Sequence, residues 1–188
     1  MEIRTFIAIP LPMEVKKELM GAQEKLKKTL ALDVKWVSSE SMHLTLKFLG
    51  DIDEGMIPSI SGCMKESLKG RSRFEFEVKG LGVFPHFKKP LVIWAGTCNT
   101  GKNFKEMHAA LDQNLETFGV PREEKEFHAH ITLGRVKRGS GGREVEEIFK
   151  PYEPVSFGKA VADRAILFKS VLGPKGAVYT PLYELDLP

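Results

Sequence analysis

Two short motifs of the same form, His-x-Thr-Leu, occur at residues 43–46 and 130–133. Alternate residues of a β-strand point to the same face, so His43 and Thr45 share one face of their strand. His130 and Thr132 share a face of theirs in the same way, and the apolar residues between them point toward a core. If the two strands meet across a groove, two imidazoles and two hydroxyls surround a space the size of a small anion.

These four groups suit the cleavage of a phosphodiester without a metal ion. Histidine titrates near a pKa of about 6.5, so one imidazole can be neutral while the other is protonated. The neutral ring takes a proton from an attacking water and the charged ring protonates the leaving oxygen, each transfer being worth roughly 10²–10⁴ in rate. The threonine hydroxyls donate hydrogen bonds to the non-bridging phosphate oxygens, on which charge builds in the transition state.

A further candidate for substrate binding follows each histidine by five residues. Arg135 follows His130 and could hold a phosphate or stack on a base, and Phe48 follows His43 and could be a platform for a base. The segment 135–143, RVKRGSGGR, combines four basic residues with three glycines. Such a loop can follow an RNA backbone or can be a solvated loop with incidental charge, and both interpretations remain open.

The motifs lie within an alternation of helical and strand-like segments. Apolar residues spaced by three or four predict helices over 11–30, 53–68, 104–118 and 143–150. Runs rich in β-branched and aromatic residues predict strands over 3–9, 42–49, 73–84, 91–97, 127–136, 161–172 and 177–187. Both motifs therefore fall on predicted strands.

The order of these segments repeats along the chain. The two motifs are 87 residues apart, and a strand-like run precedes and follows each of them at matching distances. We interpret this as a degenerate duplication, with repeats of approximately 1–90 and 91–188. It predicts one bilobal α+β domain over 1–188, whose lobes are related by a pseudo-two-fold axis.

Composition places the chain among ordinary folded proteins, with 42% hydrophobic and 28% charged residues. Its net charge of +3 is only a weak pointer to anionic partners. Cys63 and Cys98 form no close-spaced pair, and we predict a reduced, cytoplasmic protein without a signal peptide or membrane span. Asn and Gln together occur only five times beside many Lys and Glu, which is typical of thermophiles.

Several other residues have competing interpretations. His128 lies two residues before His130, and with His43 it offers three imidazoles, which could bind zinc; the motifs supply no acidic or cysteine ligand to complete such a set. We favour a site without metal or cofactor. His108 is interpreted as structural, and His86 as surface or RNA contact. Trp36 and Trp94 are more often core residues than base-stacking groups.

The sequence resembles the 2H phosphoesterase superfamily, and within it the LigT/ThpR group of RNA 2′,3′-cyclic phosphodiesterases, also called 2′-5′ RNA ligases. The resemblance covers essentially the whole chain. Besides the two motifs it rests on the stretches RTFIAIPLP, VKWV, HLTLKFLGDI, LGVFP, FHAHITLGRV and GAVYTPLYEL. One departure is Ala129, where many relatives have proline before the second histidine.

This resemblance implies two antiparallel sheets with outer helices, facing each other across a cleft that holds the site. It implies hydrolysis of a terminal RNA 2′,3′-cyclic phosphate to a 2′-phosphate, and some members also join or break 2′,5′ linkages in tRNA halves. Carried over, His43 is the general acid on the departing 3′ oxygen and His130 the general base on water. Thr45 and Thr132 hold the phosphate, with Arg135 beside it.

We therefore expect a monomeric RNA 2′,3′-cyclic phosphodiesterase. Two alternatives stay open. One is a 2H relative that trims RNA 3′ ends or cleaves 2′,5′-oligoadenylate. The other is an RNA- or nucleotide-binding module that has the fold but does not turn over, although binding alone would not require both imidazoles.

Overall fold

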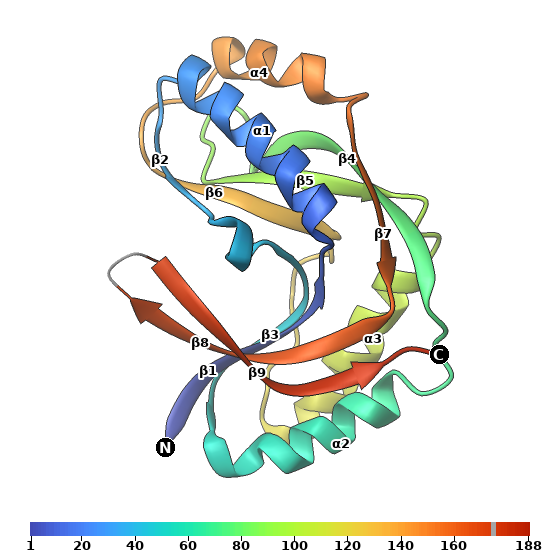
Figure 1. The fold of residues 1–188 in the computed structure, drawn as a ribbon. Helices are drawn as coiled ribbons and strands as arrows, with labels where there is room; N and C mark the ends of the chain where they lie inside the picture. The colour runs from blue at the N-terminus through green and yellow to red at the C-terminus, as the bar shows by residue number, and fades with distance from the viewer. Residues whose placement is uncertain (174–175) are drawn as a thin grey trace.

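The computed structural model describes residues 1–173 and 176–188 (Figure 1). The strands are β1 (Glu2–Pro10), β2 (Asp33–Trp36), β3 (His43–Asp53), β4 (Phe74–Phe84), β5 (Val92–Cys98), β6 (His130–Arg138), β7 (Ser156–Ala162), β8 (Arg164–Gly173) and β9 (Gly176–Asp186). The helices are α1 (Met13–Thr29), α2 (Ile57–Ser67), α3 (Asn103–Leu115) and α4 (Arg143–Phe149).

Most of these elements follow the predicted apolar patterns. The stripe predicted over 11–30 becomes α1, and Val15, Leu19 and Leu26 from it are buried. The short strand β2 and most of β7 were not predicted. The strand predicted over 127–136 was placed too early, because β6 begins only at His130.

The strands form one curled antiparallel sheet in the order β7-β4-β5-β6-β3-β1-β8-β9, with β2 paired to β6. One half of the sheet consists of β2, β4, β5, β6 and β7, and the other half consists of β1, β3, β8 and β9. The two halves join where Leu44 of β3 pairs with Ile131 of β6. The predicted antiparallel α+β fold is confirmed, and the structure adds that the two sheets are continuous at this point.

Each half of the sheet contains strands from both sequence repeats. Strand β4, from residues 1–90, pairs with β5 and β7, whereas β8, from residues 91–188, pairs with β1. The helices alternate in the same way. Helix α1 contacts β7, while α3 contacts β3 and packs on α2. Figure 1 shows α1 and α4 over one half of the sheet and α2 and α3 below the other.

Buried apolar residues of the sheet and of all four helices form a continuous core. One buried charge accompanies it: the Lys47 ammonium is 1% exposed, lies 2.7 Å from the Asp112 carboxylate and donates to the Pro121 carbonyl at 2.9 Å. Pairing of this kind is what permits a lysine to be buried. Cys63 and Cys98 are both free thiols. No helix in the described part of the chain has the length and apolar character needed to cross a membrane.

Candidate active site

The two His-x-Thr motifs meet at the junction between the halves of the sheet. Leu44 and Ile131 pair there, and both are fully buried on the core face. Continuing this antiparallel register by one residue in either direction places His43 across from Thr132. It likewise places Thr45 across from His130, so all four half-buried side chains lie on the opposite, concave face. Such diagonal neighbours have Cα atoms about 7–8 Å apart, so the two imidazoles can flank one phosphate.

A β-bulge brings Arg135 to the same face. Simple alternation from Thr132 would point residue 135 the other way, because the two are separated by an odd number of positions. In β6, however, the register slips at Leu133, so that Thr132 pairs with Trp94 and Arg135 with Val92. Val92 and Trp94 are alternate residues of β5 and share its concave face. Arg135 is therefore exposed on the face that carries the histidines.

Strand β3 has a corresponding bulge. The register with β1 slips at Leu46, so that Thr45 pairs with Ala8 and Phe48 with Phe6. Ala8 and Phe6 share a face, and Phe48 therefore lies on the same face as Thr45. The Phe48 side chain is 53% exposed, which leaves it free to contact a ligand. Each bulge thus carries the residue five positions after its histidine into the concave face.

Buried polar side chains from the helices hold the two bulged residues. Gln23 of α1 donates from Nε2 to the Leu133 carbonyl at 2.8 Å. His108 of α3 donates from Nδ1 to the Leu46 carbonyl at 2.7 Å, and its ring stacks on Phe127 at 4.4 Å. The Leu133 carbonyl also accepts from the Val37 backbone N–H at 2.9 Å, so Gln23 gives this bulged carbonyl a second donor, and His108 supplies a donor to the bulged carbonyl of Leu46.

We expect Gln23→Leu and His108→Leu to lower kcat/KM about 10-fold beyond any loss of folded protein. Leaving a bulged carbonyl underpaired costs roughly 1–3 kcal/mol and loosens the strand that aims Arg135 or Phe48. Steady-state kinetics normalised to the folded fraction measure this effect. Asn114→Leu is the matched control, because its Nδ2 donates to the Ser67 hydroxyl and not to a bulge. Equal activity per folded molecule in all three variants would contradict the positioning role.

His43 lies in an aromatic cage. Its ring stacks on Phe6 with centroids 4.7 Å apart and meets the edge of Tyr179 at 5.2 Å. The pKa of His43 is lowered from 6.5 to about 4, mainly by burial and in smaller part by the positive charges of Lys16 and His130. A hydrogen bond to the Ser41 carbonyl favours the charged form and opposes this shift. The free protein therefore holds this imidazole neutral at pH 7, and a bound anion would favour its protonation.

His130 is held in the same manner on the other strand. Its Nδ1–H donates to the His128 carbonyl at 2.7 Å, and Phe84 contacts the ring edge-on at 5.0 Å. Burial lowers the pKa of His130, the His128 carbonyl raises it, and the charges of His128 and Arg135 lower it. Because Nδ1 carries the proton, the neutral ring has its lone pair on Nε2, which is the form that a general base requires.

The pKa shifts of the two histidines predict an acidic optimum. A pair that shares one proton is most active midway between its two pKa values, and both values lie below 6.5. We expect a bell-shaped profile of kcat/KM with its maximum below pH 6.5. The maximum of kcat should lie at higher pH, because bound phosphate favours the imidazolium. A kcat/KM maximum above about pH 7.5 would contradict these environments.

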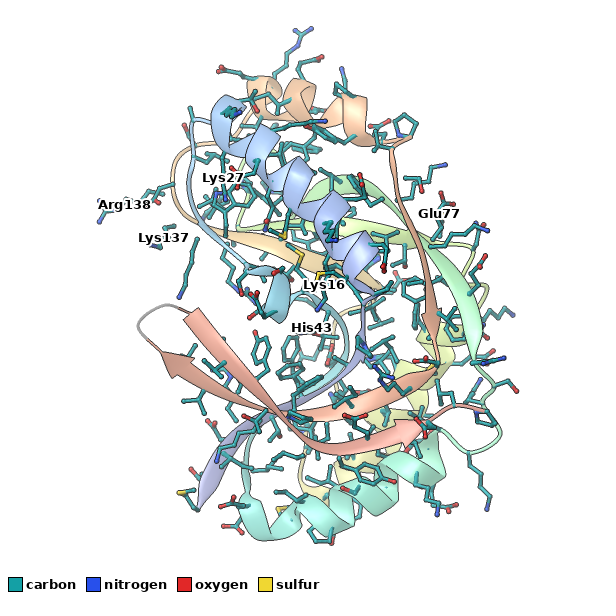
Figure 2. All side chains as sticks on the ribbon, viewed as in Figure 1. Lys16, Lys27, His43, Glu77, Lys137 and Arg138 are labelled. Carbon is teal, nitrogen blue, oxygen red and sulfur yellow. The ribbon has the colours of Figure 1, made fainter. Side chains whose placement is uncertain are left out.

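Lys16 is a site cation that the sequence did not reveal. It lies on α1 and is half-buried, and Figure 2 shows it beside His43. Burial lowers the pKa of Lys16, while the Glu40 carboxylate raises it. A lysine one position after the buried Val15 has no sequence signal for the cleft, since many helices carry lysine next to an apolar stripe.

Removing the Lys16 charge should raise the pKa of His43, since that charge lowers it. We expect Lys16→Met to show this rise in an NMR titration of the imidazole C–H resonances. We also expect kcat/KM to fall about 10-fold, the effect of one charge-assisted contact with phosphate. Lys17→Met, at the adjacent exposed lysine of α1, is the control and should change neither quantity. Identical titration curves in the two variants would exclude Lys16 from the site.

Tyr179 is a second site residue that the sequence analysis did not single out. It lies in the GAVYTPLYEL stretch, which was noted only as part of the family resemblance. Its ring closes the cage around His43. Burial raises the pKa of Tyr179, whereas the charges of Arg135 and Arg4 lower it. Arg135 thus acts electrostatically on both His130 and Tyr179, which lie on opposite halves of the sheet.

The other exposed histidines and the basic residues that follow Arg135 are described separately from this group. His128 is exposed, and within residues 1–173 and 176–188 no three His, Cys, Asp or Glu side chains are grouped so as to hold a metal ion. His86 accepts a hydrogen bond from the Lys89 backbone N–H in an exposed loop. In Figure 2, Lys137 and Arg138 project from the end of β6 away from the sheet.

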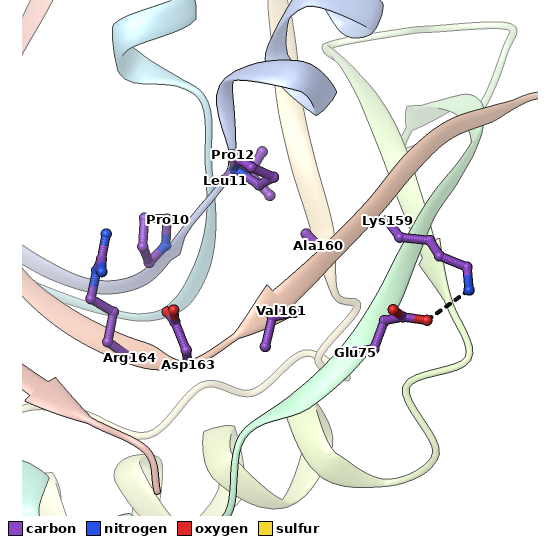
Figure 3. A pocket seen from close by; sticks show the side chains of 9 residues that line it. All are labelled: Pro10, Leu11, Pro12, Glu75, Lys159, Ala160, Val161, Asp163 and Arg164. Atoms are coloured by element: carbon purple, nitrogen blue, oxygen red, sulfur yellow. Dashed lines mark hydrogen bonds and ion pairs between the residues drawn. The ribbon is translucent and has the colours of Figure 1, made fainter.

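The described surface includes two cavities of similar size. The larger, about 330 Å³, lies between the end of β1 and strands β4 and β7, and contains the Glu75–Lys159 ion pair at 2.7 Å (Figure 3). Neither motif histidine lines it. The other, about 280 Å³, is lined by His130, by His128 and by the aromatic residues Phe84 and Trp94, among others.

Comparisons with known proteins identify the family to which this chain belongs. The family model described as LigT like Phosphoesterase matches residues 9–94 and 98–179. An RNA 2′,3′-cyclic phosphodiesterase of Thermotoga maritima is 40% identical, covering 97% of this chain and 94% of its own. A crystal structure from Thermus thermophilus has a TM-score of 0.81 and 30% identity, covering 98% of both chains. The fold also matches Escherichia coli LigT, with a TM-score of 0.74, 21% identity and 99% and 98% coverage. This chain belongs to the LigT like phosphoesterase family.

Proposed function

We propose that the protein hydrolyses terminal RNA 2′,3′-cyclic phosphates to 2′-phosphates. The observation that carries this proposal is the placement of His43, Thr45, His130 and Thr132 on one face around the Leu44–Ile131 pair. The names of its relatives support the substrate class. The reaction uses no metal or cofactor, and its substrates are RNA ends with a cyclic phosphate, tRNA halves among them.

In the proposed mechanism, His130 removes a proton from water through Nε2 as the water oxygen attacks phosphorus. The P–O3′ bond breaks on the opposite side, and His43 gives its proton to the departing 3′ oxygen. Thr45 and Thr132 donate to the non-bridging oxygens, while Arg135 offsets their charge. The geometry itself is pseudo-symmetric, so the assignment of acid and base follows the family resemblance.

The low pKa of His43 fits an acid that is charged only with substrate bound. With a pKa of about 4, the His43 imidazole is neutral in the free protein at pH 7. It gains its proton when an anionic phosphate enters the same buried space, because the negative charge favours the imidazolium. Phe48, exposed on the same face, provides a platform for the base of the cyclic nucleotide.

We further propose that residues 1–188 act as one bilobal unit, because each half of the sheet needs strands from both repeats. We propose a monomer, since the site is built entirely from one chain. A cytoplasmic location stays a prediction from the unpaired cysteines.

Product analysis tests the proposal against its alternatives. An oligoribonucleotide ending in a 2′,3′-cyclic phosphate is incubated with the protein, and the products are assigned by ³¹P NMR. A 2′-phosphate end supports the proposal. Released mononucleotides favour a nuclease that trims RNA ends, a 3′-phosphate reverses the acid and base assignment, and unchanged RNA favours a binding module.

A further inference from the structure

A pair of cations lies beyond the histidines on the concave face of the sheet. Lys35 of β2 is directly across from Arg135 of β6, and both side chains are exposed. Resting on the function proposed above, we infer that Lys35 binds the phosphodiester on the 5′ side of the terminal nucleotide. The protein therefore prefers the end of an RNA chain to a cyclic mononucleotide.

The neighbours of Lys35 in its strand determine the face to which it points. Val34 and Trp36, on either side of it, pack against the core. Adjacent residues of a strand point to opposite faces, so Lys35 points to the concave face, as its partner Arg135 does. Residues that are directly paired in an antiparallel ladder have Cα atoms about 4.5–5.5 Å apart, so the two cations are neighbours.

This pair lies one short step beyond the catalytic groups. Strand β5 gives the length of the step, because Trp94 pairs with Thr132 and Val92 pairs with Arg135. Two residues of a strand advance by about 6.6 Å. Successive phosphates of an extended RNA strand are separated by a similar length. A chain whose terminal phosphate contacts Thr132 can therefore place its next phosphate at Lys35.

The chemistry of the ribose ring decides in which direction the RNA chain leaves the site. The carbon that carries the 3′ oxygen is bonded to C4′, from which the 5′ chain continues. The carbon that carries the 2′ oxygen is bonded to C1′, which carries the base. The departing 3′ oxygen is thus on the same side of the ring as the RNA chain, and the 2′ oxygen is on the side of the base.

The two strands provide for these two sides in opposite directions. His43, which serves the departing 3′ oxygen, is across from Thr132 and so lies in the row of residues nearer to Arg135. Strand β3 then runs away from Arg135 and carries Phe48 in the other direction. The base of the terminal nucleotide therefore lies toward Phe48, and its 5′ phosphodiester lies toward Lys35.

The ammonium group of Lys35 is available to an anion. Within residues 1–173 and 176–188, no carboxylate forms an ion pair with Lys35 or Arg135. The acidic residue of β2, Asp33, is across from Arg138 at the far end of the strand. Since Arg135 is assigned to the terminal phosphate, Lys35 is left for the next one, and a lysine binds phosphate as a compact point charge.

The test compares adenosine 2′,3′-cyclic phosphate with the dinucleotide adenylyl-(3′,5′)-adenosine 2′,3′-cyclic phosphate, which adds one phosphodiester on the 5′ side. We expect Lys35→Met to lower the ratio of kcat/KM, dinucleotide over mononucleotide, about 10-fold, the effect of losing one charge-assisted hydrogen bond. For the dinucleotide, the slope of log kcat/KM against log salt concentration should become shallower by about 0.7, the contribution of one phosphate contact in a single strand. Lys35→Arg should keep most of the wild-type ratio. Lys65→Met, at an exposed lysine of α2, is the control with the same change of charge.

Other outcomes would overturn the inference. A ratio that Lys35→Met leaves unchanged would do so, whether both activities fall together or neither falls. If wild-type protein hydrolyses neither compound, the proposed function fails, and the inference is decided by isothermal titration calorimetry with the same two compounds. Weaker binding of the dinucleotide alone in Lys35→Met would then support the phosphodiester site, and equal binding in wild type and variant would overturn it.

Discussion

His43→Ala and His130→Ala should each lower kcat for cyclic phosphate hydrolysis by at least about 10², the lower bound for one general acid or base. Each substitution removes the motif imidazole on its side of the phosphate. The expected loss is mainly in kcat, because the threonines and Arg135 still bind the phosphate. Initial rates at saturating substrate, measured across pH, test this. The bell-shaped dependence of kcat on pH should lose one limb in each variant. The limb that His43→Ala loses should differ from the limb that His130→Ala loses.

The double variant sharpens the result. Acid and base act in one displacement, so losses of residues that act as a unit are not additive, and the double variant should be little worse than either single one. His86→Ala is the control, because this histidine lies in an exposed loop and belongs to neither motif. A loss below about threefold for either motif histidine would contradict acid–base catalysis by that residue.

Thr45→Val and Thr132→Val should each lower kcat by about 10², as found when one donor to a developing oxyanion is removed. Valine keeps the shape and the β-propensity of threonine, so the strand register should be unchanged. The hydroxyls stabilise charge that grows in the transition state, so KM should change less than kcat.

Thr45→Ser and Thr132→Ser keep the hydroxyl and provide the matched comparison. We expect them to retain activity within about 10-fold, the small loss reflecting a freer side-chain torsion. Valine variants with altered KM but unchanged kcat would show that the threonines bind the ground state and the transition state equally.

The placement of the motif side chains was predictable because it depends on local alternation. The i and i+2 positions of a strand share a face whatever the rest of the fold does, so His43 with Thr45 and His130 with Thr132 could be paired in advance. The apolar residues at 44 and 131 also identified the core face, and the structure buries both fully.

Arg135 and Phe48 were predicted from their side-chain chemistry and their equal spacing from the histidines, without a structural reason for them to face the site. Alternation alone would turn both residues away from the histidines, and only the bulges at Leu46 and Leu133 reverse this. A bulge depends on the pairing of two strands and on buried donors from Gln23 and His108. These interactions join residues that are far apart in the sequence, so no local pattern signals them.

The exchange of elements between repeats was likewise beyond the sequence pattern. Periodicity predicted that residues 1–90 and 91–188 resemble each other, but not that β4 pairs with β5 and β7 while β8 pairs with β1. The same holds for Lys16, which reaches His43 only because α1 lies along the cleft. Strand pairing over such separations is decided by global packing.

The most direct measurement is hydrolysis of an RNA 2′,3′-cyclic phosphate in excess EDTA, with and without added Zn²⁺. Two histidines that transfer protons need no metal, so we expect the same kcat in EDTA as in untreated protein and a 2′-phosphate as the product. Activity that is abolished by EDTA and restored by Zn²⁺ would contradict metal-free acid–base catalysis and would favour a metal site that includes His43, His128 and His130.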